Sequence, residues 1–201
     1  EAPLGEGVSS PGVLEQRLDS LGRADLFAGV VLVGQGDRVR ARKAVGLADR
    51  AKRVPMTPET RINIGSITKA FTGAAILRLA QEGRLRLDDP MGKYVEGFPA
   101  DVAGRVTIRQ LLQHRSGMGD FFTSTQFRAD PSKVRTLDDY LRIARSTPLE
   151  FEPGARERYS NLGYVVLGAV VQKVSGKPWH EAIVEYVYRP AGMTSSGVYD
   201  R

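Results

Sequence analysis

Two short β-rich runs near the beginning of the chain constrain its fold more than any other feature. The runs are AGVVLVG and RVRARKAVG, and the segment Gln35-Gly36-Asp37 between them has the glycine-containing pattern of a tight turn. This pattern predicts an antiparallel hairpin over residues 27–47. The later patterns are helical or loop-like, and a two-stranded ribbon by itself is only marginally stable in water. We therefore expect the hairpin to need further strands beside it.

Most of the remaining sequence predicts helices joined by loops. One amphipathic helix precedes the hairpin, because Val13, Leu14, Leu18 and Leu21 recur on one helical face. Further helices are predicted over four stretches: 66–82, ended by Gly83; 106–114, with Thr107 as a possible cap; 136–145; and 162–190, which holds two helices, one ended by Gly176 and the next opened by Pro178 in its first turn. The segment VPMTPETR and much of 85–160 are expected to be loop.

The charge of the chain gives little indication of a nucleic-acid partner. The 201 residues carry 29 basic and 23 acidic side chains, a formal charge of +6, but the basic residues are scattered. They are dense only in RVRARK, 38–43, where alternation places Arg38, Arg40 and Arg42 on one strand face and Val39 and Ala41 on the other. A solvated strand face explains this run, so nucleic-acid binding is not expected.

The composition excludes several other classes of protein. With 41% hydrophobic residues, the chain can form one sizeable core. It has no cysteine, so disulfides, thiolate metal sites and cysteine nucleophiles are excluded. No apolar run approaches the length needed to span a bilayer. The start Glu1-Ala2-Pro3 lacks a methionine, as a chain would after removal of a signal peptide, and on this basis we expect a secreted or periplasmic protein.

A serine and a lysine lie three residues apart at the start of the 66–82 helix. Ser66 and Lys69, in the pattern Ser-x-x-Lys, would share a helix face, where the first-turn N–H groups favour a developing negative charge. Lysine activates a serine only when neutral, which requires desolvation or nearby positive charge. Apolar residues around the motif predict a buried helix: Ile64, Ile67, Phe71, Ala74 and Ala75. An ordinary helix cap followed by a solvated lysine is the alternative.

A second polar motif, Tyr-x-Asn, ends a long loop just before a helix. Residues placed this way project into clefts more often than into cores. A lysine ammonium beside Tyr159 would favour its phenolate, which could take a proton from serine and return it to a leaving group. Asn161 could orient a substrate carbonyl and hold the lysine. The alternatives are a half-buried aromatic for Tyr159 and a helix cap for Asn161.

Together with their surroundings, the two motifs resemble the serine β-lactamase and penicillin-binding-protein superfamily, in its class C-like branch. This branch includes class C β-lactamases, D-alanyl-D-alanine carboxypeptidases, D-stereospecific aminopeptidases and β-lactamase-fold esterases. The similarity covers most of 27–197, in the segments FAGVVLVGQGDRV, INIGSITKAFTGAAILRLAQEGRLRLDDPMGKYV, VTIRQLLQHRSGM and FEPGARERYSNLGYVVLGAVVQKVSGKPWHEAIVEYVYRPAGMTSSG. It implies an α/β (α+β) fold, in which helices flank an antiparallel sheet beside a helical region.

The resemblance also implies roles for individual residues. Ser66 would be the acylated nucleophile, Lys69 its proton-handling partner, Tyr159 the general acid and base, and Asn161 a ligand of substrate and lysine. The Ser66 backbone N–H would be one oxyanion donor. No metal or cofactor is implied. His114 and Ser116 match a segment that shapes the fold near the site and are interpreted as structural, and His180 is expected to be solvated.

One element of the family pattern is not found. The family carries a Lys or His followed by Thr or Ser and Gly on a strand downstream of the GMTSSG region, and only SGK at 175–177 comes near this pattern. We therefore expect residues 1–201 to be the N-terminal portion of one catalytic domain, without its C-terminal strands and second oxyanion donor. Such a chain should expose a sheet edge and apolar helix surface, and should pair with a second chain or be unstable.

The leading hypothesis is a serine hydrolase that acts through an acyl-enzyme on a small-molecule or peptide substrate. An ester or a D-amino-acid peptide is ranked above a β-lactam, because the resemblance fixes the nucleophile better than the acyl donor. The alternative is a penicillin- or peptide-binding or assembly module without turnover, which the missing third element favours.

Overall fold

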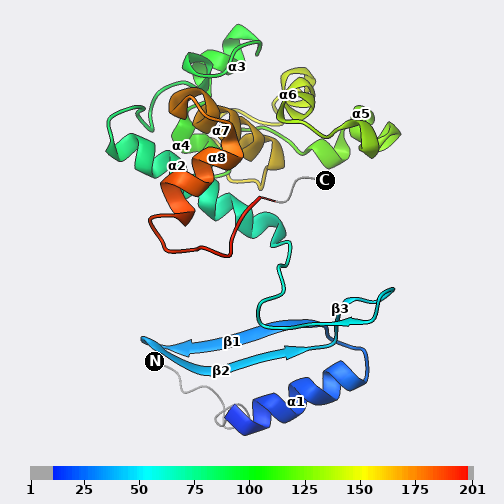
Figure 1. Ribbon diagram of the computed structural model, residues 1–201. Coiled ribbons are helices and arrows are strands. Elements are labelled where there is room, and N and C mark those ends of the chain that lie inside the picture. Colours follow the sequence, from blue (N-terminus) through cyan, green and yellow to red (C-terminus); the bar gives the residue numbers. More distant parts are fainter. Residues whose placement is uncertain (1–10, 199–201) are drawn as a thin grey trace. The chain divides into compact units, whose positions relative to one another are not determined.

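The computed structural model describes residues 11–198 (Figure 1). The start of the chain, on which the expectation of export depends, lies outside this range. The chain divides into two compact units, Glu1–Asn63 and Ile64–Arg201, and each is described by itself. All four predicted site residues belong to the second unit.

The first unit is a helix beside a hairpin. Helix α1 (Pro11–Arg23) is followed by strands β1 (Gly29–Gln35) and β2 (Arg38–Val45), which pair antiparallel and confirm the predicted hairpin (Figure 1). Gly36 in the turn has φ +56°, a conformation that glycine adopts without steric cost. Among the described residues of this unit, the buried side chains are Leu18 of α1 and Ala41 and Val45 of β2. A single helix face therefore covers part of one hairpin face.

Two expectations for this unit are wrong. Alternation predicts Val39 on an apolar face opposite the arginines, yet 61% of it is exposed, because a bulge between Val33 and Gly34 interrupts the register near the turn. The loop after the hairpin contains a second antiparallel pair, β3 (Leu47–Asp49) with β4 (Val54–Pro55). The turn between these strands includes Arg53 at φ +53° and therefore lacks the glycine that would have signalled it.

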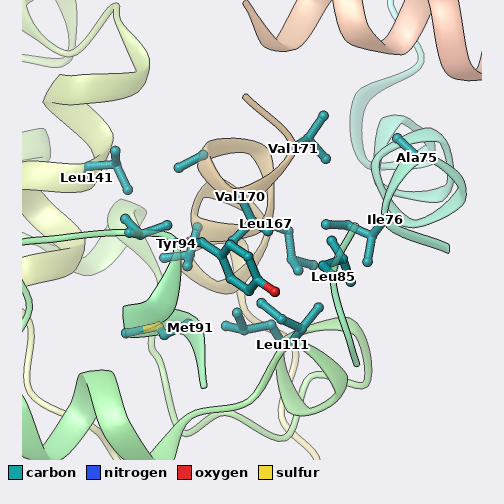
Figure 2. Close-up of a cluster of buried hydrophobic side chains, with 14 of the residues drawn as sticks. Ala75, Ile76, Leu85, Met91, Tyr94, Leu111, Leu141, Leu167, Val170 and Val171 are labelled. Carbon is teal, nitrogen blue, oxygen red and sulfur yellow. The ribbon is translucent and has the colours of Figure 1, made fainter. Parts of the chain in front are cut away.

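The second unit is built around one apolar helix. Helix α7 (Asn161–Ser175) contacts α2 (Thr68–Gln81), α4 (Ile108–Leu112), α6 (Leu137–Ser146) and α8 (Trp179–Ile183). Figure 2 shows α7 side chains among those of its neighbours. The fully buried residues of α7 and its partners include Leu162, Val166, Leu167, Val170, Ile76, Leu79, Ile108, Leu111, Ile143 and Ile183. A helix that is apolar on most sides must be surrounded in this way.

Helix ends in this unit follow the sequence signals. Thr107 caps α4 in a reciprocal capping box with Gln110, and Gly176, at φ +73°, ends α7. Pro178 occupies the N-cap position of α8, one residue before the first-turn position predicted for it. The 3-10 turn η1 (Gly65–Ile67) lies at the start of the predicted 66–82 helix, and the π-helical turn η5 (Val184–Tyr188) lies within the predicted 162–190 stretch. Other short elements were not anticipated: η2 (Met91–Lys93), α3 (Ala100–Arg105), η3 (Phe121–Thr123), α5 (Thr125–Ala129) and η4 (Pro131–Lys133).

The expectation that the 66–82 helix is buried is only partly correct. The face of α2 that contains Ala75, Ile76 and Leu79 is buried, because it packs against α7. Ile67 is 64% exposed and Leu77 is 53% exposed. Contact with α7 along one face buries one stripe of the helix and leaves the opposite side accessible.

Candidate active site

Ser66 lies in the short 3-10 turn η1 that leads into α2. The N-cap residues of η1 and α2 are Ile64 and Ile67, and neither makes a side-chain capping bond. The interpretation of Ser66 as an ordinary helix cap is therefore wrong. Ser66 is exposed, so its hydroxyl is accessible to a ligand.

Lys69 bridges the two motifs of the site. Its Nζ donates to Ser66 Oγ at 3.1 Å, as the spacing of one helical turn predicts. The same ammonium donates to Asn161 Oδ1 at 2.7 Å, a contact across 92 residues of sequence. The lysine is half-buried and paired on two sides, and so is not the freely solvated side chain of the alternative interpretation.

Asn161 is held at the beginning of α7 by its neighbour. The capping residue of α7 is Ser160, whose Oγ accepts from Gly163 N–H at 2.9 Å and donates to the Gly119 carbonyl at 2.9 Å. The alternative role of Asn161 as the cap is therefore wrong. Its side chain instead connects Lys69 to the Asp120 carboxylate, to which Nδ2 donates at 2.6 Å.

Tyr159 completes the group around the serine. Its hydroxyl donates to Ser66 Oγ at 2.6 Å, and the Lys69 ammonium lies 4.7 Å from the centre of its ring. Burial raises the pKa of the Tyr159 phenol, but hydrogen bonds with Lys69 and Ser66 and the Lys69 charge lower it more. The pKa of Tyr159 is thus below the usual value of a tyrosine. Since 49% of Tyr159 is exposed, it is not simply a core aromatic.

His114 supports Tyr159 from the side. Its ring centre lies 4.7 Å from that of Tyr159 and 5.0 Å from that of Tyr164, and its Nδ1 accepts from Ser160 N–H at 3.1 Å. Burial, and then the charge of Lys69, lower the pKa of this imidazole. A neutral His114 is required for Nδ1 to accept. These contacts fit the structural interpretation of His114.

The other polar residues considered from sequence lie outside the group. Ser116 is fully buried, and its Oγ accepts from Met118 N–H at 3.2 Å, as suits a structural residue. His180 is exposed on α8, with Nε2 3.9 Å from Glu181 Oε1.

Sequence reasoning missed Asp120 and Tyr164. Asp120 follows the glycine-rich loop after α4, and no sequence pattern connects it with Asn161, 41 residues later. Tyr164 lies one helical turn after Asn161, and its ring centre is 5.7 Å from Lys69 Nζ. The spacing alone could have suggested this second aromatic wall for the lysine.

The geometry would allow a proton to pass to or from the Ser66 hydroxyl. A hydroxyl flanked by two proton-handling groups within hydrogen-bond reach has the arrangement of an assisted nucleophile. Across the described range 11–198, no three His, Asp or Glu side chains are grouped to hold a metal ion. Over the same residues, no helix combines the length and apolar character required to cross a bilayer.

The fold and site define a serine hydrolase fold of the β-lactamase/transpeptidase type, and a family model described as Beta-lactamase matches residues 14–201. The chain is 35% identical over 187 residues to Protein flp of Staphylococcus aureus (strain MW2), covering 89% of this chain and 37% of that protein. It is 33% identical to a penicillin-binding protein from Bacillus halodurans, with a TM-score of 0.81 over 90% of this chain and 56% of the other.

A third similar structure is the D-amino acid amidase of Ochrobactrum anthropi SV3, in complex with D-phenylalanine. The identity is 30% and the TM-score 0.75, over 90% of this chain and 50% of the amidase. The chain therefore belongs to the β-lactamase family, which confirms the resemblance and the fold class expected from sequence. It spans only 37% to 56% of the lengths of these three relatives.

Proposed function

We propose that this chain carries the acylation machinery of a serine hydrolase, with Ser66 as nucleophile and Lys69 and Tyr159 as proton-transfer groups. One observation carries the proposal: Ser66 Oγ lies 3.1 Å from Lys69 Nζ and 2.6 Å from the Tyr159 hydroxyl. Both distances allow a proton to pass between these atoms and the serine.

The reaction would proceed in two halves. Ser66 Oγ attacks a carbonyl carbon while its proton passes to the Tyr159 phenolate or to Lys69 in its neutral form, and the Ser66 backbone N–H stabilises the oxyanion at the N-terminal end of η1 and α2. The proton then goes to the leaving group, which departs and leaves an acyl-enzyme. Water then attacks the ester carbonyl and gives a proton to the same group, which returns it to Ser66 Oγ as the bond to the serine breaks and the acid is released. Asn161 would hold Lys69 and orient the substrate carbonyl.

The proposed substrates are an ester or a D-amino-acid peptide, both preferred over a β-lactam. The similarity to a D-amino acid amidase and to a penicillin-binding protein supports this range. We also propose that a second oxyanion donor comes from outside residues 1–201, either from a continuation of this chain or from a separate one. The similar proteins support this, because the chain covers only 37% to 56% of their lengths.

The test is covalent labelling of the longest natural chain that carries residues 1–201. Incubation with a fluorophosphonate or penicillin should add the mass of one adduct, and Ser66→Ala should abolish it. Ser132→Ala, which removes an exposed serine on η4, is the control and should label normally. Loss of a penicillin or ester acyl group with time indicates hydrolysis, whereas a permanent adduct indicates the binding-module alternative. No adduct in the wild type would refute the nucleophile assignment.

A further inference from the structure

Asp120 is the only carboxylate that contacts the site within the described part of the chain, and it touches neither Ser66 nor Lys69. It precedes η3 and is half-buried. Its Oδ2 accepts from Asn161 Nδ2 at 2.6 Å, and its Oδ1 accepts from Phe122 N–H at 3.0 Å. Each carboxylate oxygen therefore has a defined donor.

These bonds determine which way the Asn161 amide points. An ionised carboxylate only accepts hydrogen bonds, so the amide must turn its NH₂ group toward Asp120. The amide oxygen then faces Lys69 and accepts from Nζ at 2.7 Å. If the amide flipped, its NH₂ would meet the ammonium, donor against donor, and its oxygen would meet the carboxylate, acceptor against acceptor.

We propose that Asp120 is a positioning residue for acylation: it orients Asn161, and through Asn161 it holds Lys69 Nζ against Ser66 Oγ. The inference rests on the proposed function and adds a residue outside both sequence motifs. The chain of contacts runs from Asp120 through Asn161 and Lys69 to Ser66 at 2.6, 2.7 and 3.1 Å. Asp120 carries its effect through this chain and does not itself reach the serine.

The charge of Asp120 also acts on Tyr159. The charged and titratable groups facing this phenol are Lys69 from α2, His114 from the loop after α4, Asp120 before η3 and Tyr164 from α7. The Asp120 charge raises the pKa of Tyr159 and so opposes the lowering by Lys69. Removing the charge should therefore move the pH profile of acylation to lower pH, an effect that a purely structural residue would not produce.

A capping role must be separated from this one, because Asp120 is also the N-cap of η3. Asp130 provides a matched control. It caps the 3-10 turn η4 with Oδ1 accepting from Ser132 N–H at 3.1 Å, and its other oxygen lies 3.4 Å from Lys133 Nζ. Asp120→Asn and Asp130→Asn retain the capping oxygen, but only Asp120→Asn changes what Asn161 faces.

The experiment measures the second-order rate of fluorophosphonate labelling against pH, with thermal melts, in the longest natural chain carrying these residues. D120N should label about 10- to 100-fold more slowly than the wild type, which is the effect expected from disrupting a charged hydrogen bond. The acid limb of its plot of labelling rate against pH should lie at lower pH than that of the wild type. D130N should match the wild type. The swap D120N/N161D restores donor facing acceptor at both contacts. Its amide at position 120 donates to the carboxylate at position 161, which accepts from Lys69. The swap and N161D alone both lack the Asn161 amide, but in N161D two carboxylates face each other, so the swap should label severalfold faster than N161D.

The outcomes separate this inference from the proposed function. A wild type that does not label refutes the proposed function and the inference with it. A wild type that labels, with D120N within twofold of its rate and unchanged in pH midpoint, overturns only the role of Asp120. Equal losses in D120N and D130N, or a swap that labels no faster than N161D, would do the same. If D120N melts too low to assay, the swap decides the matter alone.

Discussion

Tyr159→Phe removes a single oxygen atom and so separates the chemistry of the site from its packing. The ring would keep its contact with His114 at 4.7 Å and its position 4.7 Å from the Lys69 ammonium. The lost group is the hydroxyl 2.6 Å from Ser66 Oγ. Because this residue is 49% exposed, its hydroxyl can exchange the bond for water, and the free energy of unfolding should change by less than about 1 kcal/mol.

The catalytic effect should be much larger. General acid–base groups typically contribute about 10²- to 10⁴-fold in rate, which is about 3 to 5 kcal/mol of barrier at 1.36 kcal/mol per tenfold. We expect Y159F to slow acylation by a p-nitrophenyl ester by this factor, measured as the burst of p-nitrophenol in stopped flow. When the burst rate of the wild type is plotted against pH, its acid limb should lie below the ordinary pKa of a tyrosine, and this limb should disappear in Y159F.

Tyr164→Phe is the matched control. Tyr164 also lies against His114, and its ring centre is 5.7 Å from Lys69 Nζ, but its hydroxyl donates to the Leu112 carbonyl at 3.1 Å. Y164F should lose about 1 kcal/mol of stability and little of the burst rate. A Y159F burst within threefold of the wild type, or an equal loss in Y164F, would refute the assignment of Tyr159 as a proton-transfer group.

Two further predictions concern stability. The pKa of His114 is lowered by burial and by Lys69, so below about pH 6.5 the unfolded state binds more protons than the folded state. The free energy of unfolding of the wild type should therefore fall as the pH falls from about 6.5 through the lowered pKa. Urea melts at several pH values should show a shallower fall in H114N, and equal slopes would contradict this. Gly117 has φ +80°, and a Cβ there would clash with the Phe151 carbonyl oxygen, so urea melts of G117A should show a loss of about 2 kcal/mol or more in the free energy of unfolding. The control G104A, in open space on α3, should not be destabilised. Similar effects for both variants would contradict the backbone and steric constraint at Gly117.

Local patterns predicted the elements whose signals lie within one turn or one strand pair. The hairpin followed from two β-rich runs and Gly36, and the end of α7 from Gly176. The contact of Ser66 with Lys69 followed from their spacing on one helical turn. Three-residue turns such as η3 show no periodicity, and for that reason they were missed.

Long-range packing decided the rest of the site. Tyr159 reaches Ser66 across 93 residues only because α7 packs on α2. Neither motif by itself indicates that these two residues meet. Its place beside the serine was expected from the family resemblance. Asp120 belongs to neither motif and meets Asn161 across 41 residues, so sequence patterns gave no signal for it.

Peptide mapping of the fluorophosphonate-labelled protein tests the central claim most directly. Trypsin should release Ile62–Lys69, in which Ser66 is the one serine, and Tyr159–Lys173, which begins with the second motif and contains Ser160. Our account predicts the adduct on Ser66 in the first peptide, with fragment ions excluding Thr68. An adduct on Ser160 or any other serine, with Ile62–Lys69 unmodified, would contradict it.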